Sequence, residues 1–185
     1  MKHPQVALLA TVLLSGCTSM NDAMTPSVST LVDPFDSKTI IRQPPVNAAS
    51  GMSEAFHILG FEWNEKFPNL IFVTAGTAFR TQSIQSLAFN ADGKVFENLK
   101  AANALTDIQE GRSLRRFEIP LADFQVIATS RDVKMHLGSI NAYTVSSFGP
   151  GAGNGMAIVN LKFAPFLQQV ALARSKLTPA STRAP

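Results

Sequence analysis

The chain has a single cysteine among its 185 residues, together with one tryptophan, one tyrosine and three histidines. One cysteine allows neither a disulfide within the chain nor a cluster of thiolate metal ligands, so the fold depends on its apolar core. Charged residues make up 16% of the sequence, whereas about 25% is usual in soluble proteins. A long apolar run is also missing, because Val6–Leu14 has about half of the ~20 residues that span a bilayer. The thirteen phenylalanines predict a core built mainly from Phe.

The first sixteen residues have the three parts of a secretory signal. The segment 1–4 is short and carries Lys2, the run Val6–Leu14 is apolar, and Ser15 and Gly16 are small. This order of basic, apolar and small residues is typical of a signal peptide that is removed from the mature protein.

The sequence Leu14-Ser15-Gly16-Cys17 resembles the lipobox of bacterial lipoproteins. The resemblance implies that the thiol of Cys17 receives a diacylglyceryl group, that cleavage falls between Gly16 and Cys17, and that the new amino terminus is acylated with a chain such as palmitate. Thr18 follows the cysteine, which is similar to the pattern of lipoproteins sent to the outer membrane. We therefore expect a lipid anchor, with the folded part in the periplasm. The alternative is an ordinary secreted protein with an incidental cysteine near its cleavage site.

The composition divides the chain into four parts. We expect a signal peptide at 1–16, a lipidated cysteine and tether at 17–53, one domain at 54–177 and a disordered tail at 178–185. Within the tether, Thr39–Arg42 fits a short edge strand, and the alternative to a tether is a segment packed on the domain surface. Without Lys2 the chain has 15 basic and 13 acidic residues, a charge of +2, which is too small and too scattered to indicate nucleic-acid binding.

The hydrophobic pattern predicts a mixed fold with mostly antiparallel strands. Apolar residues alternate, or fill both faces, over seven segments: 56–63, 69–75, 83–90, 94–97, 115–119, 131–137 and 140–148. The linker Ala91-Asp92-Gly93 predicts a hairpin. Helices are expected at 99–107, after Pro120 and after Pro165. The fold class is therefore α+β, with a mostly antiparallel sheet and two or three helices packed on one face.

Motifs for catalysis or cofactor binding are missing from the sequence. The Gly-rich segment 149–155 has neither phosphate-loop nor dinucleotide-loop spacing, so we interpret it as a mobile connection. His57 and His136 both lie on strand patterns without a carboxylate at ligand spacing, which predicts no metal site. Glu62 and Glu65 flank Trp63 and resemble a sugar-cleaving pair, but the end of a strand entering a polar turn explains them more simply. We predict no cofactor.

The one basic cluster is Arg112, Arg115 and Arg116. It suggests contact with an anionic surface such as lipid headgroups or lipopolysaccharide phosphates. The alternative, which the pattern favours, is a solvent-exposed edge strand that its charges protect from pairing.

These observations predict a non-catalytic binding or scaffolding module of the envelope, with an envelope protein as its partner. One alternative is a carrier of an apolar ligand, which requires a cavity lined by Phe. Another is a hydrolase, which requires His57 or His136 in a cleft between a carboxylate and a hydroxyl. A scaffold instead requires an exposed apolar patch.

Overall fold

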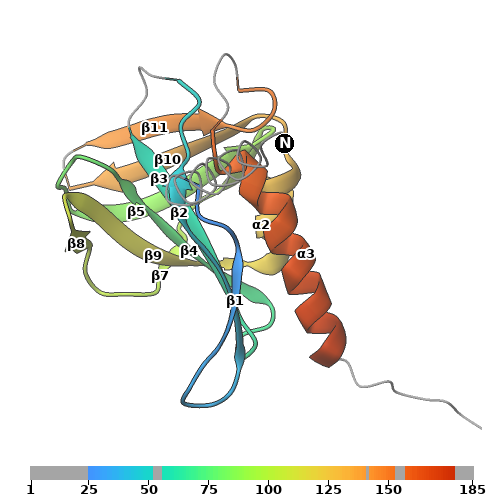
Figure 1. The fold of residues 1–185 in the computed structure, drawn as a ribbon. Coiled ribbons are helices and arrows are strands. Elements are labelled where there is room, and N and C mark those ends of the chain that lie inside the picture. The colour runs from blue at the N-terminus through green and yellow to red at the C-terminus, as the bar shows by residue number, and fades with distance from the viewer. Residues whose placement is uncertain (1–24, 52–55, 141, 153–156, 178–185) are drawn as a thin grey trace, which may run out of the picture.

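The computed structural model describes residues 25–51, 56–140, 142–152 and 157–177. Their strands form two antiparallel sheets, one of seven strands and one of four, accompanied by two helices (Figure 1). The α+β class and the mostly antiparallel pairing predicted from the sequence are therefore confirmed. Neither helix of this described part combines the length and apolar character needed to cross a membrane.

The larger sheet has the order β1-β2-β3-β4-β9-β7, and β8 also pairs with β9. Its strands are β1 (Ser29–Val32), β2 (Thr39–Asn47), β3 (His57–Asn64), β4 (Leu70–Thr77), β7 (Lys100–Ala101), β8 (Asp107–Gln109) and β9 (Arg112–Pro120). The predicted turn between β3 and β4 is present, because the N–H of Phe67 donates to the carbonyl of Asn64 at 2.9 Å. The side-chain oxygen of Asn64 also accepts a hydrogen bond from the N–H of Lys66 at 2.8 Å, which fixes the turn.

The smaller sheet has the order β11-β10-β5-β6. Its strands are β5 (Ile84–Ala91), β6 (Lys94–Phe96), β10 (Val133–Ser139) and β11 (Tyr143–Phe148). The predicted hairpin between β5 and β6 is confirmed: Asp92 and Gly93 have φ values of +49° and +91°, as a tight two-residue hairpin turn requires. The predicted pairing of the segments after Arg131 and Ile140 is confirmed by β10 and β11.

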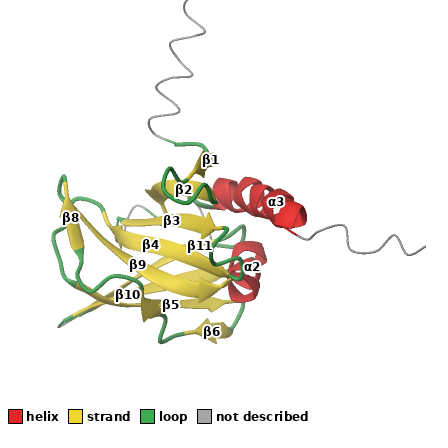
Figure 2. Cartoon of the chain, turned by 90° about the horizontal axis from the view of Figure 1, so that it is seen from below, coloured by secondary structure: helices red, strands yellow, loops and turns green. Residues whose placement is uncertain are grey.

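The two helices do not form a layer on a sheet face, so this part of the fold prediction is wrong. Helices α2 (Leu121–Thr129) and α3 (Asn160–Leu177) lie beside each other at one end of the strands (Figure 2). Buried side chains of both sheets meet in one hydrophobic cluster, so the second sheet covers apolar surface that helices were expected to cover. Helix α2 begins after Pro120 as predicted, whereas α3 begins five residues before Pro165.

The core is built from phenylalanine, as the composition predicted. The ring of Phe61 on β3 lies 5.0 Å from that of Phe124, 4.9 Å from Phe163 and 5.3 Å from Phe166. These contacts join the larger sheet to both helices and bury Phe61 almost completely. Trp63 is fully buried beside them, and its indole N–H donates to the carbonyl of Pro68 at 3.1 Å.

Residues 25–51 belong to the fold, so the predicted tether over 17–53 is wrong for this part. Strands β1 and β2 extend the larger sheet, and Ile41 is only 1% exposed. The prediction failed because Pro44 and Pro45 suggested an extended linker, whereas both lie in β2 at a register shift. The helix expected at 99–107 is also wrong, since β7, a turn and β8 occupy that segment. The expected signal at 1–16 and tail at 178–185 lie outside the described residues.

Asp92 joins the β5–β6 turn to the segment after α2. Its carboxylate accepts the N–H of Asp132 at 2.8 Å and of Arg131 at 3.0 Å. The N–H of Asp132, and then that of Arg131, hold the pKa of the Asp92 carboxyl below its ordinary value, because both donors favour the charged form. Because the pKa of Asp92 is lower in the folded state than in the unfolded state, the ionised carboxylate stabilises the fold at pH values above the unfolded-state pKa. This stabilisation is lost as the pH falls through the folded-state pKa.

We therefore expect Asp92→Asn to reduce the loss of stability that accompanies a fall in pH below about 4, the ordinary pKa of an Asp carboxyl. The measurement is urea unfolding at several pH values on both sides of that pKa. Asp92→Glu is the control that keeps the charge, and its longer side chain is expected to misplace the oxygens and flatten the pH dependence as well. A wild-type pH dependence in Asp92→Asn would contradict this role.

Candidate functional site

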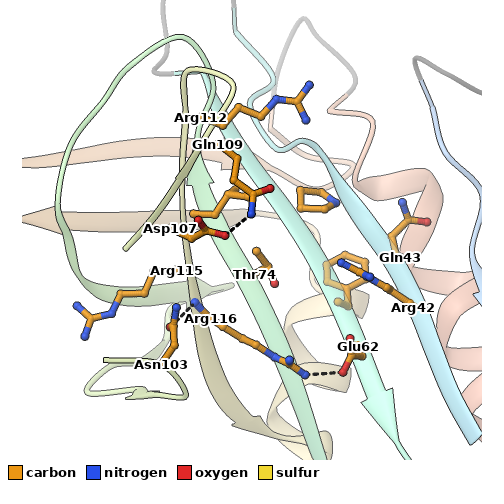
Figure 3. Close-up of a pocket in the computed structure, with 13 residues that line it drawn as sticks. Arg42, Gln43, Glu62, Thr74, Asn103, Asp107, Gln109, Arg112, Arg115 and Arg116 are labelled. Carbon is orange, nitrogen blue, oxygen red and sulfur yellow. Dashed lines mark hydrogen bonds and ion pairs between the residues drawn. The ribbon is translucent and has the colours of Figure 1, made fainter. Parts of the chain in front are cut away.

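A hollow of about 370 Å³ lies on the face of the larger sheet that points away from the core. Strands β2, β3, β4, β8 and β9 and the turn before β8 supply its lining (Figure 3). The lining residues are Arg42, Gln43, Pro45, Phe61, Glu62, Thr74, Asn103, Asp107, Gln109, Arg112, Leu114, Arg115 and Arg116. Arg42, Arg112 and Arg116 place three guanidinium groups on this face against the two carboxylates of Glu62 and Asp107, which leaves an excess of positive charge. We call it the arginine cavity.

Strand register explains how residues far apart in sequence meet there. On this face, Arg42 of β2 lies opposite Glu62 of β3. One row along, Thr74 of β4 lies between Gly60 of β3 and Arg116 of β9. Side chains at paired positions of neighbouring strands lie on the same face, so the pairing places two arginines, a glutamate and a threonine together.

Two glycines lie beside lining residues in the sheet, since Gly60 is paired with Thr74 and Gly76 with Leu114. A Cβ added at Gly60 would lie 2.8 Å from the carbonyl oxygen of Gln43, because the proline-containing part of β2 approaches β3 closely there. A Cβ at Gly76 would lie 2.0 Å from the carbonyl oxygen of Ser113. Both positions therefore require glycine.

Arg116 is held in a fixed orientation. Its guanidinium forms an ion pair with Glu62 and lies 4.2 Å from the centroid of the Phe72 ring. Its backbone N–H donates to Asn103 Oδ1 at 3.0 Å, and the Asn103 amide donates to the carbonyl of Leu105 at 2.8 Å. Asn103 thus fastens the turn before β8 against β9 and fixes one wall of the cavity.

The guanidinium groups of Arg42 and Arg112 have no interaction partner among the described residues. Neither group has an ion pair or side-chain hydrogen bond there, and both residues are exposed. Figure 3 shows Arg42 reaching inward from β2, with Arg112 at the opposite rim. An unpaired guanidinium beside a fixed one can bind an oxyanion with little reorganisation.

The three arginines predicted as one cluster have different roles. Arg116 and Arg112 lie on the outer face, whereas Arg115 points to the other side of β9, as strand alternation requires. Arg115 donates from Nη1 to the carbonyl of Ile84 and from Nη2 to that of Ala104 at 3.3 Å, so it ties the two sheets together. The favoured edge-strand interpretation is wrong, because β9 pairs with β4 on one side and with β7 and β8 on the other. Sequence reasoning missed Arg42, since its segment was expected to be a tether.

The two histidines considered for catalysis contact side chains on a neighbouring strand. His57 is fully buried, with Nδ1 2.7 Å from Ser146 Oγ and Nε2 2.7 Å from Thr144 Oγ1, so both ring nitrogens face hydroxyls. His136 lies edge-on to Tyr143, with ring centroids 4.6 Å apart. These contacts connect strands, because His57 lies on β3 and His136 on β10 while Thr144, Ser146 and Tyr143 all lie on β11.

The two glutamates expected to flank Trp63 lie in different surroundings. Glu62 pairs with Arg116, while Glu65 accepts from Lys38 Nζ at 3.1 Å and from the N–H of Thr39 at 2.9 Å. The Thr39 N–H, and then Lys38, hold the pKa of the Glu65 carboxyl below its ordinary value. Among the described residues no group of three His, Cys, Asp or Glu side chains converges as a metal site.

The carrier hypothesis requires phenylalanines around a cavity, but the buried rings contact one another. Phe148 lies 5.9 Å from Phe163 and 6.4 Å from Phe89, which continues the cluster around Phe61. The lipidation and cleavage residues, Cys17 and Gly16, lie outside the described residues. Comparison of the chain with protein-family models, with curated proteins and with solved structures finds no match. Function is therefore inferred from the site itself.

Proposed function

We propose that this protein is a lipid-anchored, non-catalytic binding module of the bacterial cell envelope. Its arginine cavity binds an anionic group. The lipobox-like sequence ending at Cys17 supports the anchor, and Thr18 supports delivery to the outer membrane with the domain in the periplasm. The cavity supports the binding role.

The observation that carries the proposal is that Arg42, whose guanidinium has no partner among the described residues, lines the same cavity as Arg116, which Glu62 and Phe72 hold in place. Concave sites of about 300–1,000 Å³ with a few convergent polar groups are typical of small-molecule binding, and this cavity lies within that range. A bidentate guanidinium–carboxylate or guanidinium–phosphate pair supplies both affinity and orientation.

Isothermal titration calorimetry of the full chain in detergent, with glucuronate and with inorganic phosphate, tests this proposal. We expect at least one of the two anions to bind, and Arg42→Gln to weaken that binding about tenfold or more, since a hydrogen bond to a charged group is lost. Lys134→Gln is the matched control, because Lys134 is an exposed cation on the other sheet. Absence of binding by both anions, or equal weakening in the control, would contradict the proposal.

A scaffolding role is the second candidate, and one observation favours it. Phe56 and Phe79 are 60% and 87% exposed and pack edge to face, with ring centroids 5.8 Å apart. Exposed aromatic pairs are typical of protein contact surfaces. Crosslinking in intact cells followed by mass spectrometry would test it, because a captured envelope protein should disappear in the Phe56→Ser, Phe79→Ser double variant.

A further inference from the structure

We infer that the ligand of the arginine cavity is an acidic sugar, a polyhydroxylated ring that carries one carboxylate. This inference rests on the proposed function and narrows it to one substrate class. The argument comes from the distribution of charged and neutral groups around the cavity.

The charged groups favour a single carboxylate over a phosphate. Arg42 offers a planar fork that matches either anion, and Arg116, whose own fork pairs with Glu62, adds positive charge beside it. Glu62 and Asp107 also line the cavity, and their charges oppose a ligand group with two negative charges. Phosphate sites commonly use free backbone N–H groups at helix starts or turns, but here the floor is strand backbone whose N–H groups serve the sheet.

The neutral groups match hydroxyls. Thr74 stands in the middle of the floor in Figure 3, between Arg116 and the β8 side chains. On β8, Gln109 Nε2 donates to Asp107 Oδ2. That bond leaves Asp107 Oδ1 and Gln109 Oε1 as acceptors. A sugar ring presents several O–H donors, so these oxygens and the Thr74 hydroxyl would each gain a partner.

The walls also provide apolar surface suited to the C–H groups of a ring. Leu114 and Pro45 line opposite sides of the cavity, on β9 and β2. The volume of about 370 Å³ lies at the lower end of the range for small-molecule sites, which suits one or two rings. An acidic sugar fits this arrangement, with its carboxylate bound by arginine on one side and its hydroxyls bound by residues of β4 and β8.

Calorimetric titration of the full lipidated chain in detergent tests the inference with three probes: glucuronate, glucose and inorganic phosphate. Glucuronate and glucose differ only in having a carboxylate or a hydroxymethyl group. We expect glucuronate to bind at least tenfold more tightly than glucose and more tightly than phosphate. We also expect Thr74→Val to weaken glucuronate about three- to tenfold and to leave phosphate unchanged.

The outcomes separate this inference from the proposed function. If phosphate binds as tightly as glucuronate, or Thr74→Val weakens both equally, the acidic-sugar inference is wrong and the anion site stands. If glucose binds as tightly as glucuronate, the carboxylate has no role and the inference is also wrong. If neither glucuronate nor phosphate binds, both fail. Gln109→Ala, on the exposed strand β8, repeats the test should Thr74→Val not fold, because it removes a neutral acceptor without changing the charge, and the same weakening is expected for glucuronate.

Discussion

Replacing Cys17 with serine is expected to leave the protein without lipid and to move it from the membrane fraction to the soluble fraction. Under the proposed function, which rests on the resemblance of residues 14–17 to a lipobox, the thiol of Cys17 accepts the lipid and a serine hydroxyl does not replace it. Each buried CH₂ contributes about 0.8 kcal/mol to membrane binding, so several acyl chains form an anchor that does not dissociate on the scale of a fractionation. Membrane fractionation with intact-mass measurement detects both changes.

Ser19→Ala is the matched control, because it changes a hydroxyl two residues away and should leave the protein in the membrane fraction. A wild-type mass equal to that of the bare polypeptide would contradict the anchor. So would a Cys17→Ser variant that stays with the membrane.

Replacing Phe61 with alanine is expected to lower the free energy of unfolding by about 3–5 kcal/mol. Phe61 is almost fully buried and contacts Phe124, Phe163 and Phe166, so its removal leaves a cavity where β3 meets both helices. Because small domains have a total stability of about 5–15 kcal/mol, this loss approaches complete unfolding in a marginal case. Urea unfolding followed by circular dichroism gives the value.

Phe35→Ala is the control, because it makes the same chemical change at an exposed position. Phe35 is 97% exposed in the turn between β1 and β2, so its removal should change stability by less than about 0.5 kcal/mol. Equal effects of the two substitutions would show that Phe61 does not hold the helices against the sheet.

The sequence was most informative where local chemistry decides the structure. Apolar residues on both faces located β3 and β4, and alternation located β10 and β11. The Asp92-Gly93 pair located the β5–β6 turn because few residues adopt its positive φ values. Pro120 marked the start of α2, since a proline nitrogen needs no hydrogen bond in a first turn.

The failures concern contacts between distant segments. Pairing with β3 turns residues 39–47 into a strand despite Pro44 and Pro45, and pairing with β9 overrides the helix propensity of the Ala-rich stretch at 99–107. The position of the helices at the strand ends depends on how the two sheets share one core, which no local pattern encodes.

The site was predicted only in part for the same reason. Arg112 and Arg116 stood out as neighbours in sequence, but their partner Arg42 is brought to them by the register of three intervening strand pairings. From the sequence, strand alternation predicts that Arg115 and Arg116 point to opposite faces of the sheet. Thr74 also lines the cavity, and its neighbours Gly60 and Arg116 follow from strand pairing that no local pattern encodes.

The most direct test of the arginine cavity is an NMR titration that follows the arginine Nε–H resonances while glucuronate is added to the full chain in detergent micelles. We expect the resonances of Arg42 and Arg116 to shift in a saturable manner, while those of Arg131 and Arg174, which lie elsewhere on the fold, stay in place. Shifts confined to Arg131 or Arg174, or no saturable shift at Arg42 and Arg116, would contradict a binding site on this face of the larger sheet.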